Sequence, residues 1–429
     1  MKILIYGINY APEPTGIGKY TGEMATWLAT QGHEVRVVAA PPYYPAWRMA
    51  DSHAGRGRSV ETMDGVQVWR CPLWVPARPN GSKRVLHLLS FALSSLPTML
   101  RQARWKPDVV WVAAPAFACT PAALLTARLA GARAWLHIQD YEVDVAFDMG
   151  LLRGRLVRSL VLSAERWLMR RFDVVSSISR RMVGRAVEKG VAPDRAVLFP
   201  NWVDVDSVKP LGGASPYRAE LQLPPDAVVA LFSGTLGAKQ GLHLIPLAAR
   251  LLRQRCPNLV FVVCGDGQMR PDMEAAAREL PNMRLLPLQP KERLPDLLGM
   301  ADIHLLPQDP GVADLVMPSK LTAMLSSGRP VVTNARPGSE VAEVVAGCGV
   351  VVSPDDAPAF AGAVEGLAAD AARRARLGAA ARLHAEQHLG ARAALGRFSQ
   401  RMELLTGVSP LPAHALIEED AGARTQTPG

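Results

Sequence analysis

The most constraining feature of this sequence is the regular alternation of short apolar runs with stretches of helical pattern. Short β-rich runs separated by helices indicate βαβ units and a mostly parallel sheet. We therefore expect an α/β chain with two doubly wound Rossmann-like domains that face across a cleft, where a ligand binds at the strand ends. The strand-like runs begin at Lys2, Glu34, Asp108, Ala132 and Asp173 in the first half, and at Ala227, Leu259, Met283, Asp302, Arg329 and Gly349 in the second.

The chain of 429 residues is long enough for two to three domains. Between the two sets of runs, Leu211 to Asp226 is rich in glycine and proline and reads as a connection. We expect a first domain over 1–205, a second over 206–385, and a C-terminal helix over 386–406 that packs back toward the first domain. The polar remainder, 407–429, has no periodicity and is expected to be a disordered tail.

Composition narrows the class of protein. Apolar residues make up 49% and charged residues 20% of the chain, as in a soluble globular protein. The five cysteines show no C-x-x-C spacing, which argues against a zinc site and a disulfide framework, and the N-terminus lacks the apolar core of a signal peptide. We therefore expect a cytoplasmic protein. The net charge of +9 favours anionic ligands or lipids, because the motifs of nucleic-acid-binding proteins are absent.

Two glycines, Gly16 and Gly18, stand just before a helix expected near Lys19 to Gln31. They fit neither a P-loop nor a dinucleotide fingerprint, because the required glycines and the Lys-Ser/Thr pair are missing. Glycines let a backbone approach a ligand closely, and free N–H groups at a helix start attract anions. The two glycines therefore indicate either an anion site or a simple turn of the chain.

Polar groups follow several of the expected strands. His137 and Asp140 end one strand of the first half, although a histidine at a strand end can equally be structural. In the second half, the strand ends carry Gly234-Thr235-Leu236-Gly-Ala-Lys239 and Gly265-Asp-Gly267, and Asp314 to Lys320 precede a helix expected to begin near Ser319. A lysine beside glycines at a helix start suits a phosphate. If these polar groups converge on one cleft, together they indicate a ligand site more strongly than any one of them does alone.

The sequence resembles the retaining glycosyltransferases of family 4, which have the GT-B fold, and within them the WcaI-like group of colanic acid biosynthesis. The resemblance rests on GINYAPEPTGIGKYTGEMATWLATQGHEVRVVAAPPYYPAW, LHIQDYEVD and MPSKLTAMLSSGRPVV, and extends over about Met1 to Leu405. It implies catalytic roles for His137 beside the donor sugar, Lys239 at the departing diphosphate and Asp140 on the acceptor side. It implies that the nucleotide sugar is bound by Gly16, Gly18, Gly234, Thr235, Lys239, Gly265, Gly267, Asp314, Pro318, Ser319, Lys320 and Leu321.

The chain departs from the family pattern at two places. Thr235 stands where the family commonly has an arginine, and Thr322 where it has a ribose-binding glutamate. Leaving-group charge would then fall on Lys239 and helix N-termini, with help from Lys320. No pair of carboxylates is evident near the sugar, which fits same-face internal return by the leaving diphosphate rather than a glycosidase mechanism. No cofactor or metal is expected, since Asp204-Val-Asp206 falls in the connection between domains.

The resemblance implies GDP-fucose as the first donor to test and a lipid-diphosphate-linked oligosaccharide as acceptor, at the inner face of the cytoplasmic membrane. Two basic and apolar segments of the first domain, Lys83–Arg101 and Leu151–Arg171, suit such a peripheral site, although both can simply cover the sheet. The alternatives are a nucleotide-sugar epimerase or dehydrogenase, and a catalytically weakened membrane-associated scaffold of the same fold.

Overall fold

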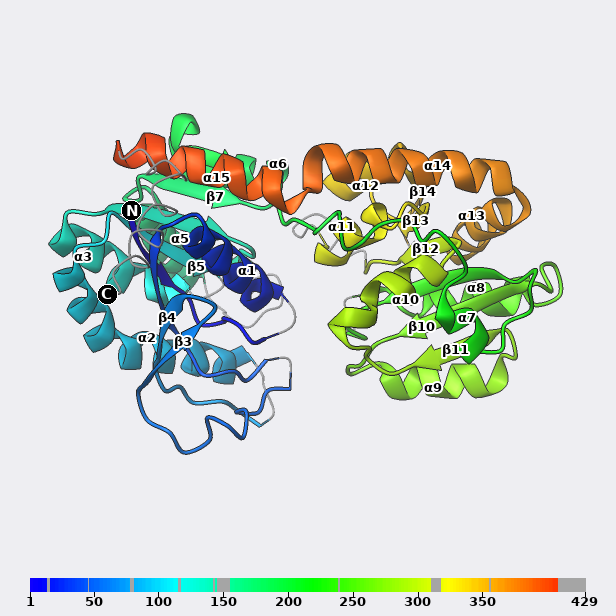
Figure 1. The fold of residues 1–429 in the computed structure, drawn as a ribbon, viewed down its shortest axis with the longest axis horizontal. Coiled ribbons are helices and arrows are strands. Elements are labelled where there is room, and N and C mark those ends of the chain that lie inside the picture. Colours follow the sequence, from blue (N-terminus) through cyan, green and yellow to red (C-terminus); the bar gives the residue numbers. More distant parts are fainter. Residues whose placement is uncertain are drawn as a thin grey trace, which may run out of the picture. The chain divides into compact units, whose positions relative to one another are not determined.

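The computed structural model describes residues 1–13, 16–44, 46–77, 81–114, 117–141, 143–144, 155–237, 240–309, 318–354 and 356–407, with only the backbone at 155–157. The chain divides into two compact units, one formed by Met1–Phe199 with the residues from Leu395 onward, and one by Pro200–Ala394. The expected tail, 407–429, lies outside the described residues except for Gly407. Figure 1 shows a sheet with covering helices in each unit.

The first unit holds a sheet in the order β3-β4-β2-β1-β5-β6-β7-β8 among the described residues. All neighbouring strands are parallel except β3 and β4, which form an antiparallel hairpin across Asp64 and Gly65. The strands are β1 (Lys2–Tyr6), β2 (Glu34–Ala39), β3 (Ser59–Met63), β4 (Val66–Arg70), β5 (Val109–Ala114), β6 (Arg133–Ile138), β7 (Val174–Ser177) and β8 (Ala196–Leu198).

Helices cover this sheet, and α2 shows how one face of a helix is buried. In α2, the buried residues include His87, Phe91, Ser95 and Met99, which recur at helical spacing. The helices are α1 (Gly16–Thr30), α2 (Gly81–Gln102), α3 (Thr120–Ala130), α5 (Arg155–Met169), α6 (Arg180–Glu188) and α15 (Ala391–Thr406). The last of these supplies Phe398, whose ring packs edge-on against Trp135 of β6.

The helix expected near Lys19 begins earlier in the structure. α1 starts at Gly16, so Gly18 is its third residue rather than part of a loop before it. Gly18 has room there only because it lacks a side chain, since a Cβ would lie 2.8 Å from a carboxylate oxygen of Glu13. The glycine therefore allows the segment before the helix to fold back against the first turn.

The second unit is a parallel sheet in the order β11-β10-β9-β12-β13-β14, as expected from the apolar runs. Its strands are β9 (Val228–Ser233), β10 (Leu259–Cys264), β11 (Met283–Leu286), β12 (Ile303–Leu306), β13 (Val331–Asn334) and β14 (Gly349–Val352). Its helices are α7 (Pro216–Glu220), α8 (Leu244–Leu252), α9 (Arg270–Glu279), α10 (Leu294–Met300), α11 (Ser319–Ser326), α12 (Glu340–Ala346), α13 (Ala357–Ala369) and α14 (Ala371–His384).

Both faces of this second sheet are buried. Along β9, Val229 and Leu231 belong to one core cluster, while Ala230 and Phe232 belong to the other. Strands covered on two faces lose the polar alternation of a half-exposed strand and become continuously apolar. This is why the central strands β9 and β10 are almost entirely apolar in sequence, whereas β11 carries the exposed Arg284.

A buried arginine links the end of β4 to the segment before α1. The Arg70 side chain is fully buried, and its Nε donates to Glu61 Oε1 at 2.6 Å. Its other nitrogens donate to the carbonyl oxygens of Ala40 at 3.0 Å and Ala11 at 2.6 Å. Three segments that are distant in the sequence are therefore held at one edge of the sheet by one guanidinium.

We predict that Arg70→Met lowers the free energy of unfolding of the first unit by about 2–4 kcal/mol, because two buried carbonyls and Glu61 lose their donor. Urea denaturation followed by tryptophan fluorescence measures this, since Trp202 is the one of nine tryptophans outside that unit. Arg133→Met is the control in the same unit, because Arg133 is exposed and pairs with Asp173, so this variant should change stability by less than about 0.5 kcal/mol. Equal stability of the two variants would contradict the prediction.

Candidate active site

In the second unit, the ends of β9 and β10 meet backbone to backbone. Gly234 N–H donates to the Cys264 carbonyl at 2.9 Å, and Leu236 N–H donates to the Asp266 carbonyl at 2.8 Å. A Cβ on Gly265 would lie 1.9 Å from the Gly234 oxygen, and one on Gly267 would lie 2.7 Å from the Leu236 oxygen. The expected donor-binding glycines are therefore brought together, and this close approach excludes any larger residue at Gly265 and Gly267.

Lys320 brings a positive charge to the same strand end. It lies in the first turn of α11, with Nζ donating to Gln240 Oε1 at 2.5 Å and standing 4.0 Å from the centre of the Phe232 ring. A Cβ on Gly234 would lie 3.6 Å from this Nζ. Burial lowers the pKa of the Lys320 ammonium to about 7. The lysine is thus held by an amide and a ring, with no ion pair among the described residues.

The neighbours of Lys320 differ in what they can offer a ligand. Ser319 is exposed at the start of α11, and Pro318 lies just before it. Leu321 is fully buried in the core, and its N–H donates to the Pro318 carbonyl. Thr322 is also buried, and its hydroxyl donates to the Ser319 carbonyl at 2.9 Å. The side chains of Leu321 and Thr322 therefore face the protein interior.

Three further residues that the sequence analysis assigned to donor binding belong to this unit. Thr235 is exposed at the end of β9, directly after Gly234. Lys239 and Asp314 lie outside the described residues, so their roles stay predictions.

In the first unit, a buried carboxylate organises the segment before α1. Glu13 accepts hydrogen bonds from Asn9 Nδ2 at 2.9 Å and from the N–H groups of Tyr43 and Tyr44 at 3.2 and 3.0 Å. Burial raises the pKa of Glu13, and these donors oppose the rise. The carboxylate fills the place that a side chain at Gly18 would need. Sequence reasoning missed Glu13, because its partners come from segments far apart in the chain.

Gly16 has a different reason to be glycine. Its φ of +61° is unfavourable for residues with a side chain, and a Cβ there would meet no atom within 4 Å. Space beside this backbone is compatible with the predicted contact to a diphosphate, which stays a prediction.

His137 lies within β6 rather than on its rim. Its ring is 3% exposed and stacks on Trp111 at 5.4 Å, with Phe199 edge-on at 5.2 Å. Its Nδ1 lies 2.9 Å from Ser176 Oγ, and burial lowers its pKa to about 3. The imidazole is therefore neutral near pH 7 and has a packing role, while its predicted contact with the donor sugar stays a prediction.

Asp140 lies two residues beyond β6 and is half-buried. The pKa of the Tyr44 phenol is raised mainly by burial and further by the negative charges of Glu13 and Asp140. Asp140, Tyr44 and Glu13 therefore share one neighbourhood at the carboxyl ends of β1, β2 and β6. Within the described residues, no group of three or more His, Cys, Asp or Glu side chains is arranged to hold a metal ion.

Comparison with known proteins identifies the class of this chain. Residues 15–202 match the model of the glycosyl transferase 4-like domain, and residues 215–384 match that of glycosyl transferases group 1. The chain is 45% identical over 368 residues to the putative colanic acid biosynthesis glycosyl transferase WcaI of Escherichia coli K12, covering 84% of this chain and 90% of that protein.

Solved structures agree on the fold. Sucrose-phosphate synthase from Thermosynechococcus elongatus superposes with a TM-score of 0.73 at 15% identity, covering 95% of this chain and 100% of that one. WaaG, a glycosyltransferase involved in lipopolysaccharide biosynthesis, superposes with a TM-score of 0.65 at 15% identity over the same shares. These matches confirm the GT-B fold. The two family models and the similarity to WcaI favour a transferase over an epimerase or dehydrogenase. The chain is a glycosyltransferase and belongs to the family of glycosyl transferase 4-like and group 1 domains that includes WcaI.

Proposed function

We propose that the chain is a retaining glycosyltransferase that moves a sugar from a nucleotide-diphosphate sugar to a lipid-diphosphate-linked oligosaccharide in colanic acid type exopolysaccharide biosynthesis. The observation that carries the proposal is the 45% identity to WcaI over both units. GDP-fucose is the first donor to test. HepE of Anabaena, which has the same fold, has been crystallised with UDP-glucose, so both bases belong in the test.

The donor diphosphate is assigned to the second unit. Gly234 is partly exposed, a Cβ there would lie 3.6 Å from Lys320 Nζ, and Lys320 supplies a cation beside this backbone. Gly265 is buried against the Gly234 carbonyl and holds the two strand ends together. Lys239 is assigned to the same diphosphate, together with the first turn of α11. This set compensates for Thr235, which has no charge where the family commonly has an arginine.

The reaction is proposed to proceed by same-face return. The bond between the anomeric carbon and the diphosphate oxygen breaks, and the acceptor hydroxyl attacks from the same face while the leaving oxygen takes its proton. Cations that face the developing negative charge then carry most of the rate. Asp140 is assigned to the acceptor hydroxyl, and no cofactor or metal is assigned.

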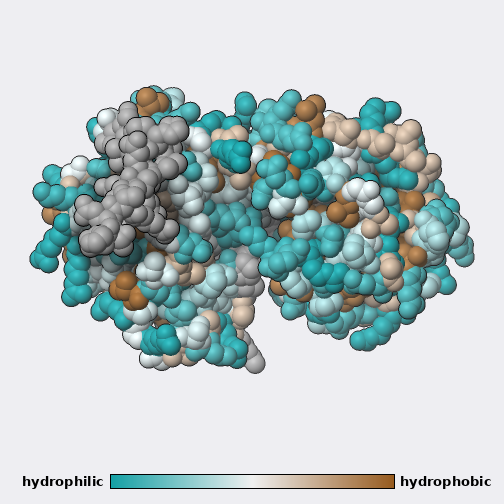
Figure 2. Space-filling model, in the orientation of Figure 1, coloured by the Kyte–Doolittle hydropathy of each residue, from teal (hydrophilic) through white to brown (hydrophobic). Residues whose placement is uncertain are grey.

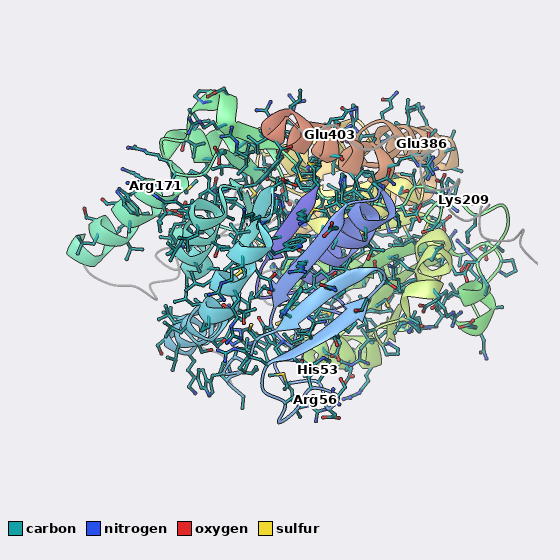
Figure 3. All side chains as sticks on the ribbon, turned by 60° about the vertical axis from the view of Figure 1, so that its left-hand side comes forward. His53, Arg56, Arg171, Lys209, Glu386 and Glu403 are labelled. Carbon is teal, nitrogen blue, oxygen red and sulfur yellow. The ribbon has the colours of Figure 1, made fainter. Side chains whose placement is uncertain are left out.

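We place the acceptor at a membrane surface, at the inner face of the cytoplasmic membrane. None of the described helices is long and apolar enough to span a bilayer. α2 exposes Leu86, Leu89 and Leu93, and Figure 2 shows apolar residues over this helix. α5 exposes Leu160 and Trp167, and Figure 3 shows Arg171 just beyond its end. Apolar side chains beside arginines suit a helix lying among lipid headgroups.

Lys239→Ala should leave the fold intact and reduce sugar transfer roughly 100- to 1000-fold, the usual scale for removing one electrostatic donor. A thermal-shift screen with GDP, UDP and dTDP first identifies the nucleotide, because a ligand that binds only the folded state raises its stability. Transfer is then measured with the matching donor. Near-normal turnover by the purified variant would remove Lys239 from the site.

Lys320→Met should stabilise the second unit most at low pH. Burial lowers the pKa of Lys320 from 10.5 in a free side chain to about 7, so between these values the unfolded chain binds the extra proton and wild-type stability rises with pH. The advantage of the variant should therefore shrink by roughly 1–2 kcal/mol from pH 7 to pH 9.

The same variant should bind nucleoside diphosphate roughly 10- to 100-fold more weakly. Denaturant melts at both pH values and calorimetry test this, and a pH-independent difference would contradict the burial of a titrating lysine.

Binding to vesicles of phosphatidylglycerol should be salt-sensitive and weakened by reversing the charges at Arg153, Arg155 and Arg158, since each arginine near an anionic surface contributes about 1 kcal/mol. Arg153 lies outside the described residues, as does the side chain of Arg155. Flotation assays measure binding, with Arg250, Arg253 and Arg278 of the second unit reversed as the control of equal charge. Wild type that stays unbound at low salt, or equal binding by the two variants, would leave a transferase without this docking surface.

A further inference from the structure

A cluster of aromatic rings in the first unit surrounds Trp47, a residue that the sequence analysis did not assign to any site. Trp47 follows β2, and its ring centre lies 5.8 Å from that of Tyr43 and 5.3 Å from that of His87 on α2. Tyr43 and His87 are themselves 4.8 Å apart, so the three rings are in mutual contact. The guanidinium carbon of Arg84, one turn before His87, lies 5.3 Å from the centre of the Trp47 ring.

This cluster retains two features that cost stability. Trp47 has a φ of +51°, a left-handed conformation that costs a bulky residue about 1–2 kcal/mol. His87 is buried, and its Nδ1 donates to the Trp74 carbonyl at 2.6 Å, but its Nε2 has no hydrogen-bond partner among the described residues. Backbone strain and unsatisfied polar atoms gather at ligand-binding sites, where the surrounding structure holds them in place. The contacts of Trp47 with Tyr43 and His87 therefore hold its ring in a fixed position at a cost in stability.

Arg84 is the charged group of the cluster. Arg84 is exposed, and its guanidinium forms no ion pair within the part of the chain that the structure describes. A guanidinium beside an indole ring is held by cation–π attraction while its N–H groups stay available for a phosphate or carboxylate. His87 is kept neutral, because burial and the charge of Arg84 both lower its pKa. The cluster thus presents one positive charge, on Arg84.

Arg84 lies near the residues assigned to the acceptor. The phenol of Tyr44 responds to three charges at once: Glu13 and Asp140 raise its pKa, and Arg84 lowers it. Tyr44 also donates its backbone N–H to Glu13 at 3.0 Å.

Ring contacts connect Arg84 to the same region, because the Trp47 ring beside Arg84 also contacts Tyr43. The backbone N–H of Tyr43 donates to Glu13 at 3.2 Å. This region follows the carboxyl ends of β1 and β2, which is the end of a parallel sheet where ligands bind.

We propose that Arg84, positioned by Trp47, binds a phosphate oxygen of the acceptor while Asp140 faces its sugar hydroxyl. The ligand class is an alkyl diphosphate that carries a glycan, and a bidentate guanidinium–phosphate contact would recognise it. The inference rests on the proposed function and deepens it, because it names the group that distinguishes a phosphate-linked acceptor from a neutral glycan.

The probe is geranyl diphosphate, which is water-soluble, compared with geraniol by calorimetry without vesicles. Wild type should bind the diphosphate and not the alcohol. Arg84→Gln should weaken this binding roughly 10- to 100-fold, Arg84→Lys should restore part of it, and Trp47→Ala should weaken it as well. Arg101→Gln is the matched control, because it removes the same charge from an exposed position on the same helix. Thermal melts confirm that each variant is folded.

The other arms separate the sources of phosphate. GDP and UDP binding should be unchanged in Arg84→Gln, and its loss would assign Arg84 to the donor instead. Loss of binding to phosphatidylglycerol vesicles with geranyl diphosphate binding intact would assign Arg84 to a bilayer headgroup. Wild type that binds a nucleotide but not geranyl diphosphate, or equal binding by Arg84→Gln, would overturn the inference alone. Wild type that binds no nucleotide would overturn the proposed function itself.

Discussion

Parallel strand pairing is the constraint on which the rest of each unit depends. Every parallel neighbour delivers its carboxyl end to the same edge, so the loops that follow the strands must share limited space there. In the second unit the pairing places Ser233 opposite Cys264, and the next residues of both strands approach within hydrogen-bonding distance. Gly234 and Gly265 follow from that register, because a side chain at Gly265 would overlap the neighbouring carbonyl. The close packing of the two strand ends is therefore a sufficient reason for glycine at position 265, and Gly234 keeps part of its backbone exposed.

In the first unit, buried charged side chains as well as glycine hold the loops that crowd together after the strands. Arg70 holds the carbonyls at the ends of two segments, and Glu13 holds the amides of Tyr43 and Tyr44. Each charged group is buried and each is satisfied mainly by backbone, which fixes the loops without a helix or a strand. Gly18 fits against Glu13, so the glycine that resembles a phosphate-binding residue also has a packing reason. Whether it also contacts a diphosphate is independent of that reason.

The sequence was informative where one face or both faces of an element are buried along its whole length. Each strand of the second sheet was visible as an apolar run, but the β3–β4 hairpin was missed, although Asp64-Gly65 is a typical hairpin turn. Its outer strand alternates in exposure and so lacks an apolar run. The positions of Gly265 at a strand end and of Lys320 in the first turn of a helix were predictable from the sequence, while their ligand-binding roles stay predictions. The contacts of Glu13, Trp47 and Arg84 were not predictable, because they join segments that no local pattern relates.

Under the donor-binding role proposed for Lys320, its charge would replace that of the arginine that the family commonly has at Thr235. An arginine stays protonated when it is buried, whereas the pKa of a buried lysine falls. The pKa of Lys320 is lowered to about 7 because its described partners, Gln240 and the Phe232 ring, only partly replace the water around the ammonium group. An anion beside the amine would favour its charged form and offset part of the cost of burial. If Lys320 binds the donor diphosphate as proposed, the ligand completes the electrostatics of this position, and raising the pH above 7 opposes binding because the lysine loses its proton.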